Sequence, residues 1–248
     1  MLNTHLIKKL VFFFPIILFP IFVAVKITYP EIYELMIQED SFVEYAQAFF
    51  YFLSSVGSFF ISIRFLKKRF PLYGILYALL GTGLLLVSFE EISWGQRIFN
   101  IHSPEYFSSR NTQNEISFHN LKSMQPFVHK AYILIGLYGT CAWLILLSKI
   151  QKGLEILRFI IPDWFLSSYF FFVFCLYTVY ENINYILYFI GPRGIGIFEM
   201  NELRRIFHHL SWRDQEPAEL LLSLGFLLFV IVNGIRSRKM SPIASSRA

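Results

Sequence analysis

Residues 72–93 read LYGILYALLGTGLLLVSFEEIS, an apolar run that ends with two adjacent carboxylates, Glu90 and Glu91. A helix needs roughly 20 apolar residues to cross the ~30 Å hydrocarbon core of a bilayer, and this run has that length. We expect a membrane-spanning helix here, because a backbone surrounded by lipid must satisfy its own hydrogen bonds. Ionisable side chains are costly inside a membrane, so the carboxylate pair indicates the end of the span or a polar interior.

Further apolar runs of similar length occur along the chain. Hydrophobic residues make up 55% of the sequence and charged residues only 16%, against about a quarter in soluble proteins. None of the runs alternates apolar and polar residues as the strands of a membrane barrel do. The sequence therefore predicts an all-α polytopic bundle in one domain, residues 1–236, followed by a flexible tail at 237–248. The six expected spans are residues 10–29, 43–65, 72–93, 127–148, 165–190 and 217–235.

The basic residues beside the spans predict the topology. Thirteen Lys and Arg residues flank the side that carries both termini, whereas seven lie in the three connections on the other side. Positive residues accumulate on the cytoplasmic side, so we expect cytoplasmic termini and two longer loops, with short interfacial helices, that face outward. A bacterial inner membrane is the expected location. The same pattern accounts for the net charge of +5 without a nucleic-acid partner.

Polar side chains recur within or at the outward ends of the spans. In the second span Glu44 and Gln47 begin a stripe with helical spacing, and Glu219 lies near the start of the sixth span. Glu181 and Asn184 belong to the fifth span, where a rise of about 1.5 Å per residue places Glu181 roughly 13 Å below the outward end. We expect these groups to share a polar pocket that opens outward.

The loop after the third span adds further candidates. Asn111, Glu115 and His119 are spaced four residues apart, so a helix there would align them on one face. Close carboxylates push each other's pKa apart, as acid and base catalysis requires. The catalytic candidates are Glu90, Glu91, Glu115, His119 and Glu181, and the candidates for substrate binding are Trp94, Gln96, Arg97, Glu44, Asn184 and Glu219. A divalent metal stays open as a cofactor, with Glu91, Glu115, His119 and His208 as candidate ligands.

The string EEISWGQRIF from Glu90 to Phe99, followed by NxQxExxxHN from Asn111 to Asn120, resembles a signature of uncharacterised polytopic membrane proteins. The resemblance implies a shared membrane fold and brings no known activity. A vaguer similarity is to membrane hydrolases of the alkaline ceramidase type, which bury a zinc site among helices. This chain departs from that type because no span carries two histidines spaced for one helix face.

Three classes of function remain open. The leading expectation is a membrane-embedded enzyme that acts on a lipid or lipid-linked head group from the outer leaflet, with Arg97 holding an anionic group. Glu90 or Glu91 would act as base or metal ligand, and His119 as proton carrier or second ligand. The alternatives are a transporter or proton-coupled channel lined by Glu181, and a non-catalytic assembly or sensor protein. A transport path must continue across the membrane, whereas the inner halves of the spans are almost purely apolar.

Overall fold

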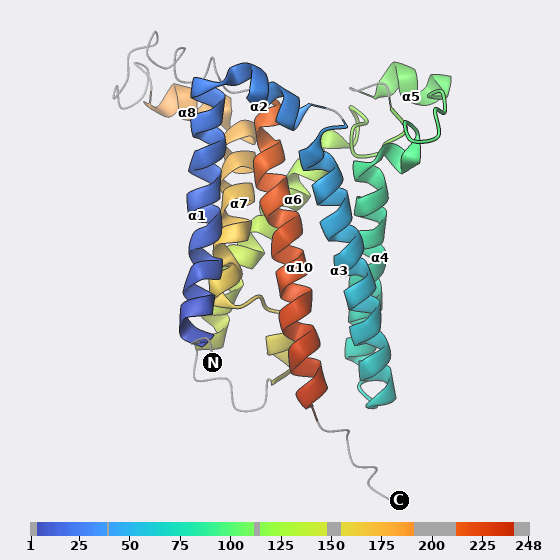
Figure 1. The fold of residues 1–248 in the computed structure, drawn as a ribbon, viewed down its shortest axis with the longest axis vertical. Helices are drawn as coiled ribbons and strands as arrows, with labels where there is room; N and C mark the ends of the chain where they lie inside the picture. Colours follow the sequence, from blue (N-terminus) through green and yellow to red (C-terminus); the bar gives the residue numbers. More distant parts are fainter. Residues whose placement is uncertain (1–3, 39, 112–114, 148–154, 191–211, 241–248) are drawn as a thin grey trace, which may run out of the picture.

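The computed structural model describes residues 4–38, 40–111, 115–147, 155–190 and 212–240. Six helical stretches within these ranges are long and apolar enough to cross a membrane, which confirms the predicted all-α polytopic bundle. In the described part of the chain the only β-type pairing is one isolated bridge between Asn111 and Leu121. Figure 1 shows both termini at the same end of the bundle. We call this the termini end, and the opposite end, where residues 92–124 lie, the loop end.

Each expected span corresponds to one helical stretch. Four are single helices: α1 (Thr4–Thr28), α3 (Phe42–Lys67), α4 (Pro71–Glu91) and α10 (Glu216–Lys239). The fourth span is α6 (Gln125–Cys141), which continues into the 3-10 segment η2 (Ala142–Leu147). The fifth comprises η4 (Glu155–Phe159), η5 (Trp164–Leu166) and α7 (Ser167–Glu181). Both α4 and α10 have a proline in their first turn, a position where its missing N–H costs no hydrogen bond.

Small residues bring the helices together in two pairs. In the first pair, α3 and α4, Ser55 Oγ donates to the Gly81 carbonyl oxygen at 2.7 Å and Ser62 Oγ to that of Gly74 at 2.6 Å. Such close approach between small residues is typical of membrane helices. The second pair is α6 and α7, and α10 packs against both α3 and α7. Within the described residues α4 and α6 are not a closely packed pair, so one side of the bundle stays open between them.

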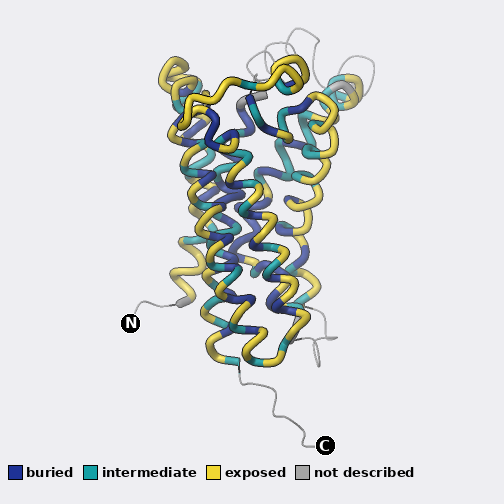
Figure 2. Tube along the Cα trace, turned by 90° about the vertical axis from the view of Figure 1, so that its right-hand side faces the viewer, coloured by how far each residue is buried: buried dark blue, intermediate teal, exposed yellow. Residues whose placement is uncertain are grey.

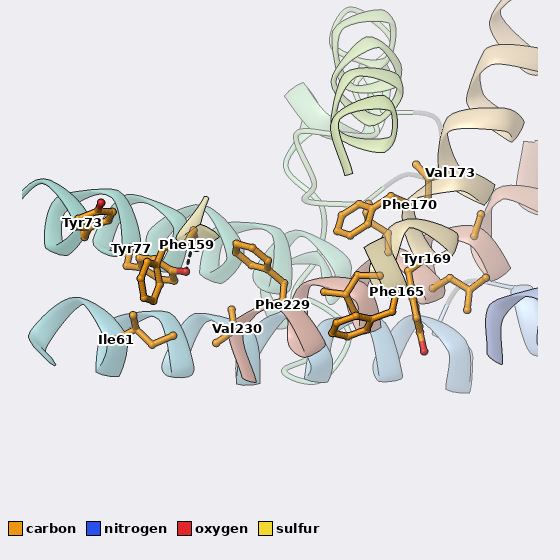
Figure 3. Packing of buried hydrophobic residues seen from close by; sticks show 14 of the residues in the cluster. Ile61, Tyr73, Tyr77, Phe159, Phe165, Tyr169, Phe170, Val173, Phe229 and Val230 are labelled. Carbon is orange, nitrogen blue, oxygen red and sulfur yellow. Dashed lines mark hydrogen bonds between the residues drawn. The ribbon is translucent and has the colours of Figure 1, made fainter. Parts of the chain in front are cut away.

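Buried aromatic and aliphatic side chains fill the termini end (Figure 3). Phe65 is fully buried, and its ring lies 5.1 Å from that of Phe159 between centroids. Tyr77 donates its hydroxyl hydrogen to the Phe159 carbonyl oxygen at 2.7 Å. Arg236 on α10 makes a two-pronged ion pair with Asp163 at 2.7 and 2.5 Å. Figure 2 shows the buried residues along the interior and exposed residues, many of them apolar, on the outside, as a bilayer-embedded bundle requires.

Basic side chains of α3 also bind the end of α10. Arg64 donates to the Gly234 carbonyl oxygen at 2.9 Å and to Ser237 Oγ at 2.8 Å. Lys68, which follows α3, donates to the Ser237 carbonyl oxygen at 2.7 Å. The last four carbonyls of a helix lack partners within it, so Lys68 satisfies a group that α10 leaves open, whereas Arg64 binds a carbonyl oxygen one turn further inside.

The fifth span differs from the prediction because the helix breaks at Asn182. Asn182 has φ −113° and ψ 14°, outside the helical region, and its Nδ2 donates to the Thr178 carbonyl oxygen at 2.9 Å. A side chain that bonds its own backbone competes with the helix ladder. Helix α8 (Ile183–Ile190) then leaves the bundle sideways at the loop end (Figure 1). Glu181 therefore ends α7 instead of lying about 13 Å deep, and the predicted face that continued to Asn184 is wrong.

The connections at the loop end also differ in detail from the prediction. The first carries a short helix, α2 (Pro30–Ile37), and the second carries α5 (Glu105–Arg110). The expected helical alignment of Asn111, Glu115 and His119 is wrong, because these residues lie in turns around the bridge at Asn111. Most of the third connection, residues 191–211, lies outside the described residues.

Candidate functional site

An apolar cavity of about 450 Å³ lies between α3, α4, α6 and α10, in the half of the bundle nearer the loop end. This volume falls within the ~300–1,000 Å³ that is typical of small-molecule sites. Along α4 the cavity extends from Leu79 to Glu91, roughly 18 Å at about 1.5 Å per residue. That length is close to half of a ~30 Å hydrocarbon core. Glu90, Glu91 and His119 line the cavity toward the loop end, and Tyr51 and Tyr132 add hydroxyl groups.

Glu90 fastens the α4–α6 loop (residues 92–124) over the end of α4. Its Oε2 accepts the backbone N–H groups of Phe118 at 2.6 Å and His119 at 3.0 Å, and its Oε1 accepts the indole N–H of Trp94 at 2.5 Å. The ring Nδ1 of His119 lies 3.2 Å from the same Oε2. Glu90 is thus held by four nitrogen atoms that all come from one loop. The side chain of Trp94 serves this contact and stacks on Phe89, and it does not line the cavity.

His119 combines a partly buried position with acidic neighbours. Burial alone lowers the pKa of His119, but the hydrogen bond to Glu90 and the charges of Glu90, Glu219 and Glu115 together raise it above its ordinary value. The protonated form of His119 is therefore more favoured than that of a free imidazole. Since Nδ1 is held by Glu90, the other ring nitrogen, Nε2, is the one available to a ligand in the cavity.

The backbone reverses sharply where α4 ends. Ser93, Trp94 and Gly95 follow one another with φ values of 47°, 54° and 74°, all in the left-handed region. Such a conformation costs of order 1–3 kcal/mol for each non-glycine residue and persists only where other contacts fix it. Those contacts are present here: Ser93 donates a short hydrogen bond to Glu115, and Trp94 is held by Glu90.

Glu115 is a buried anchor of the loop. Only 5% of the residue is exposed, and its carboxylate accepts hydrogen bonds from Ser93, from Ser117 at 2.8 Å and from Asn120 at 2.6 Å. Arg97 lies 3.9 Å from the same carboxylate. Because its oxygens are occupied by the loop itself, Glu115 supports the position of His119 and does not line the cavity.

Gln96 and Arg97 likewise bind protein groups. Gln96 accepts the Ile116 N–H at 2.6 Å and donates to Ser103 at 2.7 Å. Arg97 forms an ion pair with Asp40 at 2.8 Å, which links the α4–α6 loop to the start of α3. Neither residue lines the cavity. Their expected roles in substrate binding remain predictions that the geometry does not favour.

Glu91 differs from its neighbour because it makes no hydrogen bond or ion pair with any described residue, although it lines the cavity. Four other carboxylates act on it electrostatically, with that of Glu219 first. The others are Glu216, Glu44 and Glu115. Of these five carboxylates only Glu91 lines the cavity, and it has no hydrogen-bond or ion-pair partner among the described residues. The expected convergence of the acidic groups on one pocket stays a prediction.

On α10 the cavity is lined by Leu222 and Phe226, whereas the carboxylates in the first turn of this helix bind protein groups. Glu219 accepts a short hydrogen bond from the hydroxyl of Tyr177, and Glu216 accepts from Gln47 at 2.9 Å. Gln47 is fully buried and donates also to the Glu216 backbone oxygen at 3.1 Å, while its own Oε1 has no hydrogen-bond partner. Glu44 instead caps α3: Ser41 Oγ accepts the Glu44 N–H at 3.4 Å, and Glu44 accepts the Asp40 N–H at 2.5 Å.

Glu181 forms a separate pair with His129, whose Nδ1 lies 2.5 Å from Glu181 Oε1. The ring of His129 lies 5.3 Å from that of Tyr177, which stacks on Tyr132 at 4.6 Å. The sequence analysis did not single out His129. Its spacing of three residues from Tyr132 places both side chains on the face of α6 that packs against Tyr177 of α7. The pair lies beside the cavity and does not line it. The side chain of Asn184 and all of His208 lie outside the described residues.

No group of three or more His, Cys, Asp or Glu side chains within the described ranges is arranged to hold a metal ion. Glu91, Glu115 and His119 do not form one, because Glu115 binds the loop and His119 binds Glu90.

Comparison with protein families, with curated proteins and with solved structures found no match to this chain. The likeness of residues 90–120 to a family signature therefore stays a prediction.

Proposed function

We propose that this protein is a membrane-embedded enzyme that binds an amphiphile in the cavity and acts on its head group by acid and base catalysis. The observation that carries the proposal is an apolar cavity whose ionisable groups, Glu90, Glu91 and His119, all lie at one end. A hydrocarbon tail suits the apolar part, and a reacting head group suits the polar end. The excess of basic residues at the termini end supports a loop end that faces outward, as in a bacterial inner membrane.

Each of the three residues has a distinct role in this proposal. Glu91 acts as the general base, because its carboxylate has no partner among the described residues. His119 in its protonated form acts as the acid through Nε2, and Glu90 orients it through Nδ1. In a hydrolysis, Glu91 accepts a proton from water and the water oxygen bonds to the electrophilic atom of the head group. The bond from that atom to the leaving group breaks, and the leaving group takes the electron pair and a proton from His119.

A transport function is less well supported. A path across the membrane has to continue from the cavity to the termini end, where Phe65, Tyr77 and Phe159 fill the interior. At that end Arg236 and Asp163 pair with each other, and the buried hydroxyls of Ser58 and Ser62 on α3 donate to backbone oxygens. An enzyme needs access from one side only, which agrees with a cavity confined to half of the bundle.

The experiment uses the full chain in lipid nanodiscs that contain a total lipid extract, with lipid products followed by mass spectrometry. We expect conversion of one lipid class by the wild type, and loss of conversion in Glu91→Gln and His119→Gln. Glu105→Gln, an exposed site on α5, is the control and keeps full conversion. Wild-type conversion by both Glu91→Gln and His119→Gln would contradict the proposal.

A further inference from the structure

We propose that the amphiphile carries a cationic, N–H-bearing head group of the ammonium type, which Glu91 holds at the polar end of the cavity. This inference rests on the proposed function and names its substrate class. Three observations carry it: two carboxylates, Glu90 and Glu91, line the polar end of the cavity, Glu91 has no hydrogen-bond or ion-pair partner among the described residues, and a side opening lets a tail enter from lipid.

Near the loop end, four of the described basic side chains are already paired with carboxylates. The pairs are His119 with Glu90, Arg97 with Asp40, His129 with Glu181 and Lys26 with Asp214. Lys122 and Lys130 are exposed and do not line the cavity. A phosphate or carboxylate head group would therefore meet the charge of Glu91 without a Lys or Arg among the described cavity-lining residues to offset it. A cationic head group would instead be attracted by the carboxylate of Glu91.

Glu91, at the polar end of the cavity, has no hydrogen-bond donor among the described residues. Acceptors away from water are normally satisfied in native structures. An ammonium group brings up to three N–H donors and one positive charge, so it can satisfy both the oxygens and the charge of this carboxylate. A hydroxyl group brings one donor and no charge.

The tail has access from the side, between α4 and α6. Leu79 on α4 is 64% exposed and Ile135 on α6 is 37% exposed, yet both line the cavity. Gly83 lies on the same wall, and a Cβ atom added there meets nothing within 4 Å. The wall is thus open at Gly83, and a large side chain at this position would fill the space of the tail without touching the carboxylates.

The experiment compares three probes with the same dodecyl chain: the primary amine, the alcohol and the phosphate monoester. Binding to the full-length protein in nanodiscs is measured by native mass spectrometry. We expect the amine to bind about tenfold or more tightly than the other two, the size of one charged hydrogen bond. Glu91→Gln should remove this preference and leave the affinity for the alcohol unchanged. Gly83→Trp should abolish binding of all three, whereas Leu86→Trp, on the lipid-facing side of α4, should not.

The outcomes separate the two proposals. If the alcohol or the phosphate binds as tightly as the amine, or if Glu91→Gln keeps the preference, the cationic head group is wrong while the amphiphile site stands. If no probe binds, or if Gly83→Trp binds all three as the wild type does, the cavity is not an amphiphile site and both proposals fail.

Discussion

Replacing Glu90 by Gln tests whether this carboxylate holds the α4–α6 loop in place. The wild-type carboxylate accepts the N–H groups of Phe118, His119 and Trp94. An amide turns one of its two oxygens into a donor, so one hydrogen bond is lost, and the remaining bonds lose their charge. A charged hydrogen bond contributes about 1.5–3 kcal/mol and a neutral one about 0.5–1.5 kcal/mol. One lost bond and two weakened bonds therefore reduce the local stability of the loop by about 3–5 kcal/mol.

Hydrogen exchange measured by mass spectrometry is the suitable assay, because it reports local opening of the peptide that contains residues 116–121. A loss of 3 kcal/mol corresponds to exchange faster by about a hundredfold, since 1.4 kcal/mol is a factor of ten. The peptides of α3 and α10 should exchange as in the wild type, which shows that the fold is intact. Glu105→Gln serves as the control. Unchanged exchange at residues 116–121 in Glu90→Gln would refute the role of Glu90 as the anchor.

Three further predictions follow from the same contacts. Because folding raises the pKa of His119, its protonated form stabilises the loop fully below the ordinary value of about 6.5, and this contribution is lost as pH rises through the folded pKa. Opening of residues 116–121, measured by hydrogen exchange and corrected for intrinsic exchange, should therefore increase from pH 6 to pH 9. A similar increase in His119→Gln would contradict this. Gly136→Ala places a Cβ 2.7 Å from the Phe174 backbone nitrogen and should lower the unfolding stability by about 1–3 kcal/mol in detergent, whereas Gly83→Ala should not. In a variant without Cys141 and Cys175, His119→Cys should react with a water-soluble maleimide and Ser62→Cys should not; equal labelling would favour a transport path.

The spans were predictable because their length and apolar character are local properties of the chain. The ends of α3 and α4 lie within two residues of the expected limits. The end of α7 was not predictable in this way, because the apolar residues continue through Ile183–Ile190. The break depends on the Asn182 side chain, and the position of Glu181 depends on His129, which comes from another helix. Side-chain hydrogen bonds of this kind cannot be predicted from the pattern of apolar residues.

The candidate site was likewise predictable only in part. Glu90, Glu91 and His119, which line the cavity, were among the residues named from the sequence, and the contact between Glu90 and His119 joins two of them. The helical alignment of Glu115 with His119 failed, because spacing alone does not reveal that acceptors elsewhere bind the loop backbone. The Ile116 N–H binds Gln96. The sequence therefore identified residues of the candidate site, whereas their arrangement depends on hydrogen bonds between residues that are distant in the sequence.

The cations at the termini end have a consequence for experiments on membrane insertion. Arg64 and Lys68 belong to the positive residues that set topology, and they also bind carbonyl oxygens in the last two turns of α10. In this protein, removing these charges to invert the orientation also uncaps a helix. A topology reporter read on such a variant would record misassembly together with any inversion, so the two effects have to be separated by placing new positive charges at the loop end while Arg64 and Lys68 are kept.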